Sequence, residues 1–178
     1  MFRQVPVLPV VVPLAAVLLG VLLAVLHRRD RLTVPRAAVA VALCVYAAGV
    51  VANTVFPVFL DKPARHAPWA AALHLVPVAG YEVADALMNI LVFVPVGILV
   101  PLVLVRASAV RVVAVGAAFS LLIEVTQLVT ANLLGGGHVA DINDLLSNVA
   151  GAALGLGLLR LATRVPALDR FADRFRWS

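Results

Sequence analysis

Long apolar stretches recur along the chain, separated by short polar or basic segments. Five of them come close to the ~20 residues that a helix needs to cross the ~30 Å hydrocarbon core of a bilayer. They are Val5–Leu26, Ala37–Leu60, Ala86–Val105, Val112–Leu134 and Leu145–Ala162. The pattern predicts an all-α fold, a polytopic bundle of five transmembrane helices, in a single membrane domain covering residues 1–178.

Two further segments have apolar content but are too short to span. Residues 61–85 contain the apolar run 69–78, for which we expect an interfacial or re-entrant helix, or alternatively an ordered loop packed on the bundle. In the C-terminal tail, residues 165–178, apolar and basic side chains alternate. This alternation predicts a short amphipathic helix at the membrane surface.

Composition supports a membrane protein. The chain is 63% hydrophobic and 13% charged, against ~25% charged in ordinary soluble domains, so lipid has to cover much of its surface. The net charge is +5, but the arginines flank the apolar stretches. We therefore expect membrane lipids as partners and no nucleic acid. The single cysteine, Cys44, excludes an intrachain disulfide and a Cys/His metal cluster, and we expect no cofactor and no metal.

Basic residues predict how the bundle is oriented. Of the 14 lysines and arginines, all but Arg3, Lys62 and Arg65 fall on the side of the bundle that holds the C-terminus. The positive-inside rule puts this side in the cytoplasm. The sequence therefore predicts a multi-pass protein of the cytoplasmic membrane, with its N-terminus outside and its C-terminus inside.

One carboxylate interrupts the fourth apolar stretch. Glu124 lies ~18 Å above the cytoplasmic start of this span, where a charged group costs at least ~2.5 kcal/mol on insertion scales. Ser120, Glu124 and Gln127 share one helical face because they follow an i, i+4, i+7 spacing. Chains retain such groups in a bundle interior or a water-filled cavity, so a polar site is expected here.

Other polar residues fall at the same level of neighbouring spans. Helical rise places them in or just above the outer leaflet. The set expected to form a ligand-binding or functional polar cluster is Asp85, Asn89, Glu124, Gln127, His138, Asp141, Asp144 and Asn148. The last span continues this face with Gly151-x-x-x-Gly155, a close-packing motif of membrane helices. The motif suits packing within one chain or between copies, so a homo-oligomer is left open.

The polar cluster has a structural and a functional interpretation. In the first, it is an interhelical hydrogen-bond lock, with Glu124 neutral or bonded to Gln127 and Asn148, and Asp144 serving as a helix N-cap. In the second, it is a pocket open to the outer face. Asparagine or glutamine would lock helices without the insertion cost of an acid, which favours the pocket. A metal site that uses His138 is disfavoured, because a lone histidine beside acids in a loop is usually solvated.

Three sequence blocks carry a family resemblance. NILVFVPVG at 89–97, IEVTQ at 123–127 and DINDLLSNVAG at 141–151 follow the patterns N-x-x-x-F-x-P-x-G, E-x-x-Q and R-x-x-D-x-x-D-x-x-x-N-x-x-G. These blocks resemble those of the VanZ-like family of membrane proteins, and the looser resemblance covers about residues 45–160. HLVP at 74–77 is similar to a further family element. His138 stands where the family usually has arginine.

The resemblance implies a role in the cell envelope. The founding member of the family is linked to low-level resistance to teicoplanin, a lipoglycopeptide antibiotic, so contact with a lipid-linked wall precursor or a lipoglycopeptide is expected. Two alternatives remain. One is a membrane enzyme acting on a lipid-linked glycan, with Glu124, Asp141 and Asp144 as acid and base. It is disfavoured because there is no nucleophile motif. The other is a small proton-coupled transporter.

Overall fold

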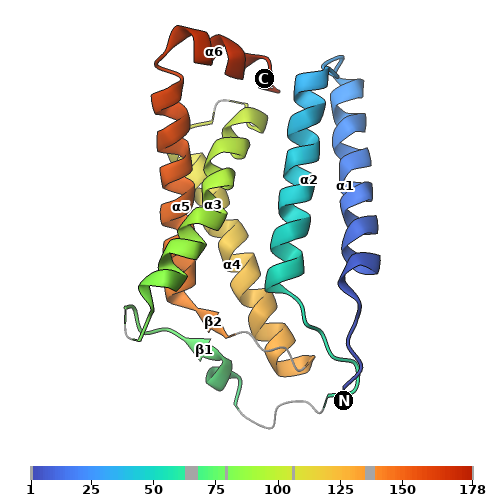
Figure 1. The fold of residues 1–178 in the computed structure, drawn as a ribbon, viewed down its shortest axis with the longest axis vertical. Coiled ribbons are helices and arrows are strands. Elements are labelled where there is room, and N and C mark those ends of the chain that lie inside the picture. Colours follow the sequence, from blue (N-terminus) through green and yellow to red (C-terminus); the bar gives the residue numbers. More distant parts are fainter. Residues whose placement is uncertain (1, 63–67, 79, 106, 135–138, 178) are drawn as a thin grey trace.

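The computed structural model describes residues 2–62, 68–78, 80–105, 107–134 and 139–177. Within these ranges the chain forms an α-helical bundle with one two-stranded sheet (Figure 1). The helices are α1 (Val7–Arg28), α2 (Val34–Thr54), α3 (Val83–Val103), α4 (Ala109–Leu133), α5 (Ile142–Ala162) and α6 (Pro166–Asp173). Helices α1 to α5 are each long and apolar enough to cross a membrane, so the predicted all-α bundle of five membrane helices is confirmed.

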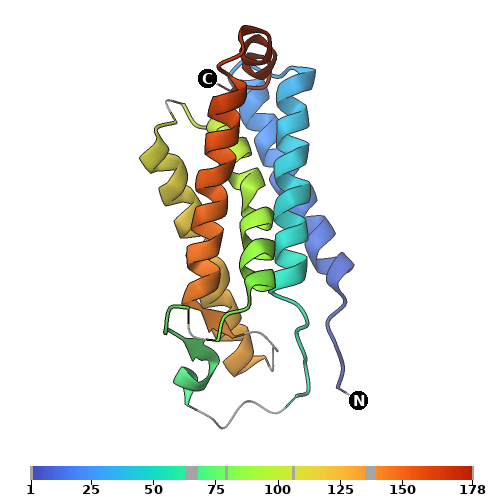
Figure 2. The same cartoon turned by 60° about the vertical axis from the view of Figure 1, so that its left-hand side comes forward.

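The bundle has two contrasting ends. The α6 end carries α6, the α1–α2 connection and the C-terminus, whereas the β end carries the small sheet and the N-terminus (Figures 1 and 2). Helices α3 and α5 begin at the β end, and α4 finishes there. The two termini lie at opposite ends because five helices cross the bundle.

Several predicted boundaries shift, each for a local reason. Helix α2 ends at Thr54 instead of Leu60, because Pro57 lacks an N–H group and restricts the residue before it. Helices α3, α4 and α5 each begin almost one turn earlier than predicted. Helix α4 begins early because the Ser108 side chain caps it, accepting a hydrogen bond from the Arg111 main-chain N–H.

The centre of the bundle is a close contact between α3 and α5. A Cβ atom on Gly151 would collide with the Ile90 main-chain oxygen, and one on Gly155 would collide with that of Val94. Gly97 of α3 faces α5 in the same way. The small-residue motif of α5 therefore packs within the chain, main chain against main chain.

The segment between α2 and α3 is not the expected interfacial or re-entrant helix. Its described residues contain only a short 3-10 helix, Trp69–Ala72, followed by β1 (Leu73–His74). Pro68 and Pro77 bracket this region, and proline interrupts helical hydrogen bonding. Strand β1 pairs in parallel with β2 (Ala140–Asp141). The alternative interpretation, an ordered loop packed on the bundle, describes this segment.

The predicted amphipathic helix of the tail is present as α6, and the residues after it fold back onto the bundle. The Trp177 main-chain N–H donates to the Leu102 oxygen at 2.7 Å. Arg31 donates to the Trp177 oxygen at 3.0 Å and Arg36 to the Arg176 oxygen at 2.7 Å. Trp177 is buried as a result, with 7% of its surface exposed. The last turn of the chain thereby ties α1, α2 and α3 together.

Candidate functional site: a carboxylate cluster at the β end

The parallel strand pair places Asp141 at the centre of the site. Asp141 is the last residue of β2 and the N-cap of α5, where its Oδ1 accepts a hydrogen bond from the Asn143 main-chain N–H at 2.8 Å. The expectation that Asp144 caps this helix is wrong. Asp141 takes that role because the helix begins at Ile142, one turn earlier than the apolar pattern indicated.

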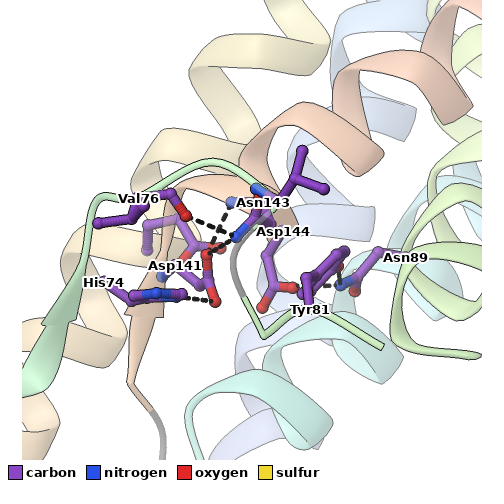
Figure 3. Close-up of polar contacts among 9 residues, drawn as sticks. His74, Val76, Tyr81, Asn89, Asp141, Asn143 and Asp144 are labelled. Atoms are coloured by element: carbon purple, nitrogen blue, oxygen red, sulfur yellow. Dashed lines mark hydrogen bonds and ion pairs between the residues drawn. The ribbon is translucent and has the colours of Figure 1, made fainter. Parts of the chain in front are cut away.

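His74 and Asn143 connect Asp141 to the loop that follows β1. In the strand register His74 lies opposite Asp141, and its Nδ1 is 2.9 Å from Asp141 Oδ2. Asn143 accepts a hydrogen bond from the Val78 main-chain N–H at 2.7 Å and donates to the Val76 oxygen at 3.4 Å. Figure 3 shows these contacts converging on the start of α5. The loop is fixed to α5 by side chains that were not among the predicted site residues.

Asp144 joins α5 to α3. Its Oδ1 accepts hydrogen bonds from the Tyr81 hydroxyl at 2.7 Å and from Asn89 Nδ2 at 2.6 Å, and Asn89 Nδ2 is also 2.9 Å from the Tyr81 oxygen (Figure 3). Burial raises the pKa of Tyr81. The hydroxyl therefore keeps its proton at neutral pH and is available as the donor to Asp144.

Glu124 is buried against the same turn. It has 7% of its surface exposed, and its Oε2 accepts a hydrogen bond from the Asp141 main-chain N–H at 2.8 Å. The expected partners Gln127 and Asn148 do not bond to it, because Asn148 Nδ2 donates to Ser120 Oγ at 2.9 Å instead. Ser120, Glu124 and Gln127 are all buried, as their shared helical face predicts.

Two buried amide oxygens, one on α4 and one on α5, are left without hydrogen bonds. Gln127 Oε1 and Asn148 Oδ1 have no partner in the described part of the chain. Leaving a buried acceptor unpaired costs ~1–3 kcal/mol. These two oxygens are therefore available to accept hydrogen bonds from a further group.

A small pocket opens beside the buried carboxylate. Glu124 and Asp141 are among the residues that line it, although almost all of its accessible surface is apolar. The remaining lining is apolar and comes from the β1 region, α4, β2 and α5: Leu73, Leu75, Leu121, Val125, Leu128, Ala140, Ile142 and Leu145. The pocket holds about 120 Å³, less than the ~300–1,000 Å³ of pockets that enclose a whole small molecule. It is large enough for part of an amphipathic ligand.

The predicted residues differ in where the structure places them. Asn89 and Asp144 meet directly, as do Glu124 and the main chain of Asp141. Gln127 and Asn148 are buried nearby, whereas Asp85 is exposed in the first turn of α3. His138 lies outside the described residues. Among the residues that the structure describes, no group of three or more His, Cys, Asp or Glu side chains is arranged to hold a metal ion.

Sequence reasoning missed His74, Tyr81 and Asn143 as members of the cluster. Tyr81 lies in the loop between β1 and α3, Asn143 of α5 bonds to that loop, and His74 of β1 bonds to Asp141 of the paired strand. Helical periodicity carries no information about such contacts. The available signal was the presence of polar side chains in an otherwise apolar segment. HLVP at 74–77 already stood out for its similarity to a family element.

Comparison with known families shows where this chain belongs. The family model described as VanZ/LLP1 matches residues 43–163. The chain belongs to the VanZ/LLP1 family. The matched region runs from within α2 to the end of α5 and contains the whole hydrogen-bonded cluster. A search of the curated proteins and a search of the solved structures each found no match.

Within this VanZ/LLP1 protein, the family region and the cluster coincide. Helices α3, α4 and α5, which supply Asn89, Glu124 and Asp144, lie entirely inside the matched residues. Helices α1 and α6 lie outside them. The polar end of the bundle is therefore built from the part of the chain that defines the family.

Proposed function

We propose that this VanZ/LLP1 membrane protein binds an amphipathic molecule of the cell envelope at its β end, either a lipid-linked wall precursor or a lipoglycopeptide such as teicoplanin. The observation that carries the proposal is the pocket between α4 and α5. Its surface is almost wholly apolar, and two residues of the carboxylate cluster, Glu124 and Asp141, are among those that line it. An amphipathic ligand needs this combination of polar and apolar contacts.

The proposal includes an orientation. We place the β end outside the cytoplasmic membrane and the α6 end in the cytoplasm, because the arginines gather at the α6 end. Envelope precursors carry their sugars and peptides on the outer side, so this orientation presents the cluster to them. To test this orientation, a single cysteine is placed at Asp61 or at Arg164 in a Cys44→Ala background. Its reactivity with a membrane-impermeant thiol reagent is then measured. Labelling at position 164 alone would contradict it.

The chemistry of the cluster indicates what the ligand offers. Glu124, Asp141 and Asp144 are acceptors when ionised, and the oxygens of Gln127 and Asn148 are acceptors without a partner. A matching ligand supplies hydroxyl or amino donors, which sugars and glycopeptides have in number. The small apolar pocket takes one segment of the ligand, and the lipid-facing side chains of α4 beside it, Leu121 and Val125, are exposed to its tail.

A binding comparison tests the proposal directly. The protein in nanodiscs is titrated with lipid-linked wall precursor and with teicoplanin, and Glu124→Gln is compared with wild type. The matched control is Glu82→Gln, because Glu82 is the chain's other glutamate and is exposed before α3. We expect binding to weaken about tenfold or more in Glu124→Gln, as for loss of a charged hydrogen-bond partner, and to be unchanged in the control.

Two outcomes would contradict this function. Equal affinity in wild type and Glu124→Gln would remove Glu124 from ligand binding. If wild type binds neither compound while Glu124→Gln loses thermal stability, the cluster is a helix lock.

A membrane enzyme is the second candidate, favoured by the convergence of Glu124 and Asp141 on one pocket. Carboxyl groups are able to act as general acid and base on a lipid-linked glycan. The test is whether wild type forms product in the same nanodiscs. If it does, and if Asp141→Asn abolishes product formation while binding is retained, the protein is a membrane enzyme and not only a binding protein. Absence of product under conditions where the precursor binds would exclude it for that substrate.

A further inference from the structure

A second pocket lies at the α6 end, the end of the bundle opposite the carboxylate cluster. It is lined by Arg29, Arg31, Val105 and Trp177 and holds about 390 Å³. This volume lies within the ~300–1,000 Å³ typical of ligand sites. Neither the family match nor the proposed function at the β end makes use of it.

The pocket is built by tertiary contacts between distant parts of the chain. Arg29 is the C-cap of α1, and Asp30 after it adopts a left-handed conformation, φ 53°, that turns the chain toward α2. Trp177 forms the opposite wall, where its main-chain N–H bonds to Leu102 and its indole N–H donates to the Arg36 oxygen at 3.3 Å. The two walls are therefore held at a fixed separation by hydrogen bonds.

The positive charge of this pocket is not balanced by described acidic side chains. Arg31 donates to the main-chain oxygen of Trp177, which is neutral. The acids of α6, Asp169 and Asp173, both pair with Arg176. Within the described ranges, no ion pair joins an acidic side chain, including the adjacent Asp30, to Arg29 or Arg31. Two guanidinium groups are thus concentrated beside an apolar wall.

We propose that this pocket binds the phosphate group of an anionic membrane lipid. Guanidinium groups present planar pairs of donors that match phosphate oxygens, and basic pockets between membrane helices are a known form of lipid headgroup site. Val105 and Trp177 provide the apolar side against which glycerol and the first acyl carbons lie. Leu168 and Phe171 of α6, at the same end of the bundle, are 47% and 58% exposed.

The matched pair Arg29→Gln and Arg28→Gln tests the site. The two substitutions change the net charge equally, but Arg29 lines the pocket and Arg28, the last residue of α1, is absent from its lining. Binding of phosphatidylglycerol to the purified protein is measured by native mass spectrometry and by the rise in unfolding temperature, with phosphatidylcholine as the zwitterionic comparison. We expect about tenfold weaker phosphatidylglycerol binding in Arg29→Gln, wild-type binding in Arg28→Gln, and no selective binding of phosphatidylcholine.

Further arms distinguish the source of the phosphate and the role of charge. Inorganic phosphate and glycerol 1-phosphate are titrated as water-soluble competitors, and we expect neither to displace phosphatidylglycerol. Displacement by either would overturn the lipid assignment in favour of a soluble phosphate. Arg29→Lys keeps the charge and should retain part of the binding. Equal lipid binding in Arg29→Gln and Arg28→Gln would overturn the site. A negative result for the lipid site would not contradict the function proposed for the β end, because Arg29 lies at the other end of the molecule.

Discussion

The β end and the α6 end hold the bundle together with opposite kinds of hydrogen-bonding group. At the β end, acidic side chains accept hydrogen bonds, for example Glu124 from the Asp141 main chain and Asp144 from Tyr81. At the α6 end, arginine side chains donate to main-chain oxygens, for example Arg36 to Arg176. Each end satisfies the polar groups that a loop or a helix terminus leaves open, one with acceptors and the other with donors.

The difference shows which groups the bundle itself requires. Between the two ends, α3 and α5 meet through glycine and main-chain atoms with no ionisable side chain in the contact. Association of membrane helices rests on such close packing. The charged residues at either end are therefore separable from central packing, and substitutions there report on local attachment or binding.

The largest effect is expected in the centre, where both ends lose a common support. Gly155→Ala places a methyl group against the Val94 oxygen, which cannot rotate away. Overpacking costs ~1–3 kcal/mol, occasionally more, and we expect this collision with fixed main chain to exceed that range in detergent unfolding. Gly157→Ala is the control, since nothing lies within 4 Å of its new methyl group and alanine favours a helix. Equal stability of the two variants would refute the central role of this contact.

Next in size is the loss of the tail anchor. Trp177→Ala removes a buried indole, and buried Trp→Ala changes cost ~3–5 kcal/mol, with the low end expected near a chain terminus. Hydrogen exchange should accelerate at Arg31, Arg36 and α6 and stay unchanged at the Asp141 amide. Trp69, half exposed in the loop, gives the control Trp69→Ala. Faster exchange at both ends would mean that the ends are coupled.

Loss of the corresponding hydrogen bonds at the β end should destabilise the protein less. Asp144→Ala leaves the Tyr81 hydroxyl and the Asn89 amide without their acceptor, which should cost ~2 kcal/mol. Exchange should then accelerate in the loop near Tyr81 and remain unchanged at α6. Asp85→Ala is the matched control, because Asp85 is an exposed acid of the same region with no hydrogen bond among the described residues. We expect Asp85→Ala to change the free energy of unfolding by less than ~1 kcal/mol.

The smallest expected effect is the dependence of stability on pH through Tyr81. Burial raises the folded-state pKa of Tyr81, so its contribution to stability is fully present below the unfolded value of ~10 and is lost as pH rises through the folded value. In Tyr46→Phe, which leaves Tyr81 as the remaining tyrosine, tyrosinate absorbance should therefore appear only above pH ~10. Absorbance that appears at or below this pH would contradict the buried donor to Asp144.

Helices were predictable from the sequence because lipid imposes a simple rule on their length and composition. The five spans, the buried face of Ser120, Glu124 and Gln127, and the packing face of Gly151 and Gly155 all follow from apolar runs and 3.6-residue periodicity. Boundaries were less predictable. Capping by Ser108 and Asp141 and interruption at Pro57 depend on local main-chain geometry that hydropathy does not report.

The loops of the site could not be predicted in the same way. The pairing of His74 with Asp141 depends on a two-residue parallel strand pair between segments far apart in sequence. The role of Tyr81 depends on where that loop then runs. These are tertiary contacts with no local periodicity, so the sequence indicated the acids of the cluster and the donor Asn89 but not His74 and Tyr81.

The glycine contact between α3 and α5 also has a mechanical consequence. Two helices that touch main chain to main chain have no layer of side chains able to repack, so they move as one rigid body and hold the Asn89–Asp144 link constant. Glu124 and much of the apolar wall of the pocket belong to α4, whose contacts with this pair include side chains such as Ala152 against Gly116 and Asn148 against Ser120. One side of the site is thus formed by the rigid α3–α5 pair and the other by α4, which is able to slide against that pair. The position of α4 sets how widely the pocket opens.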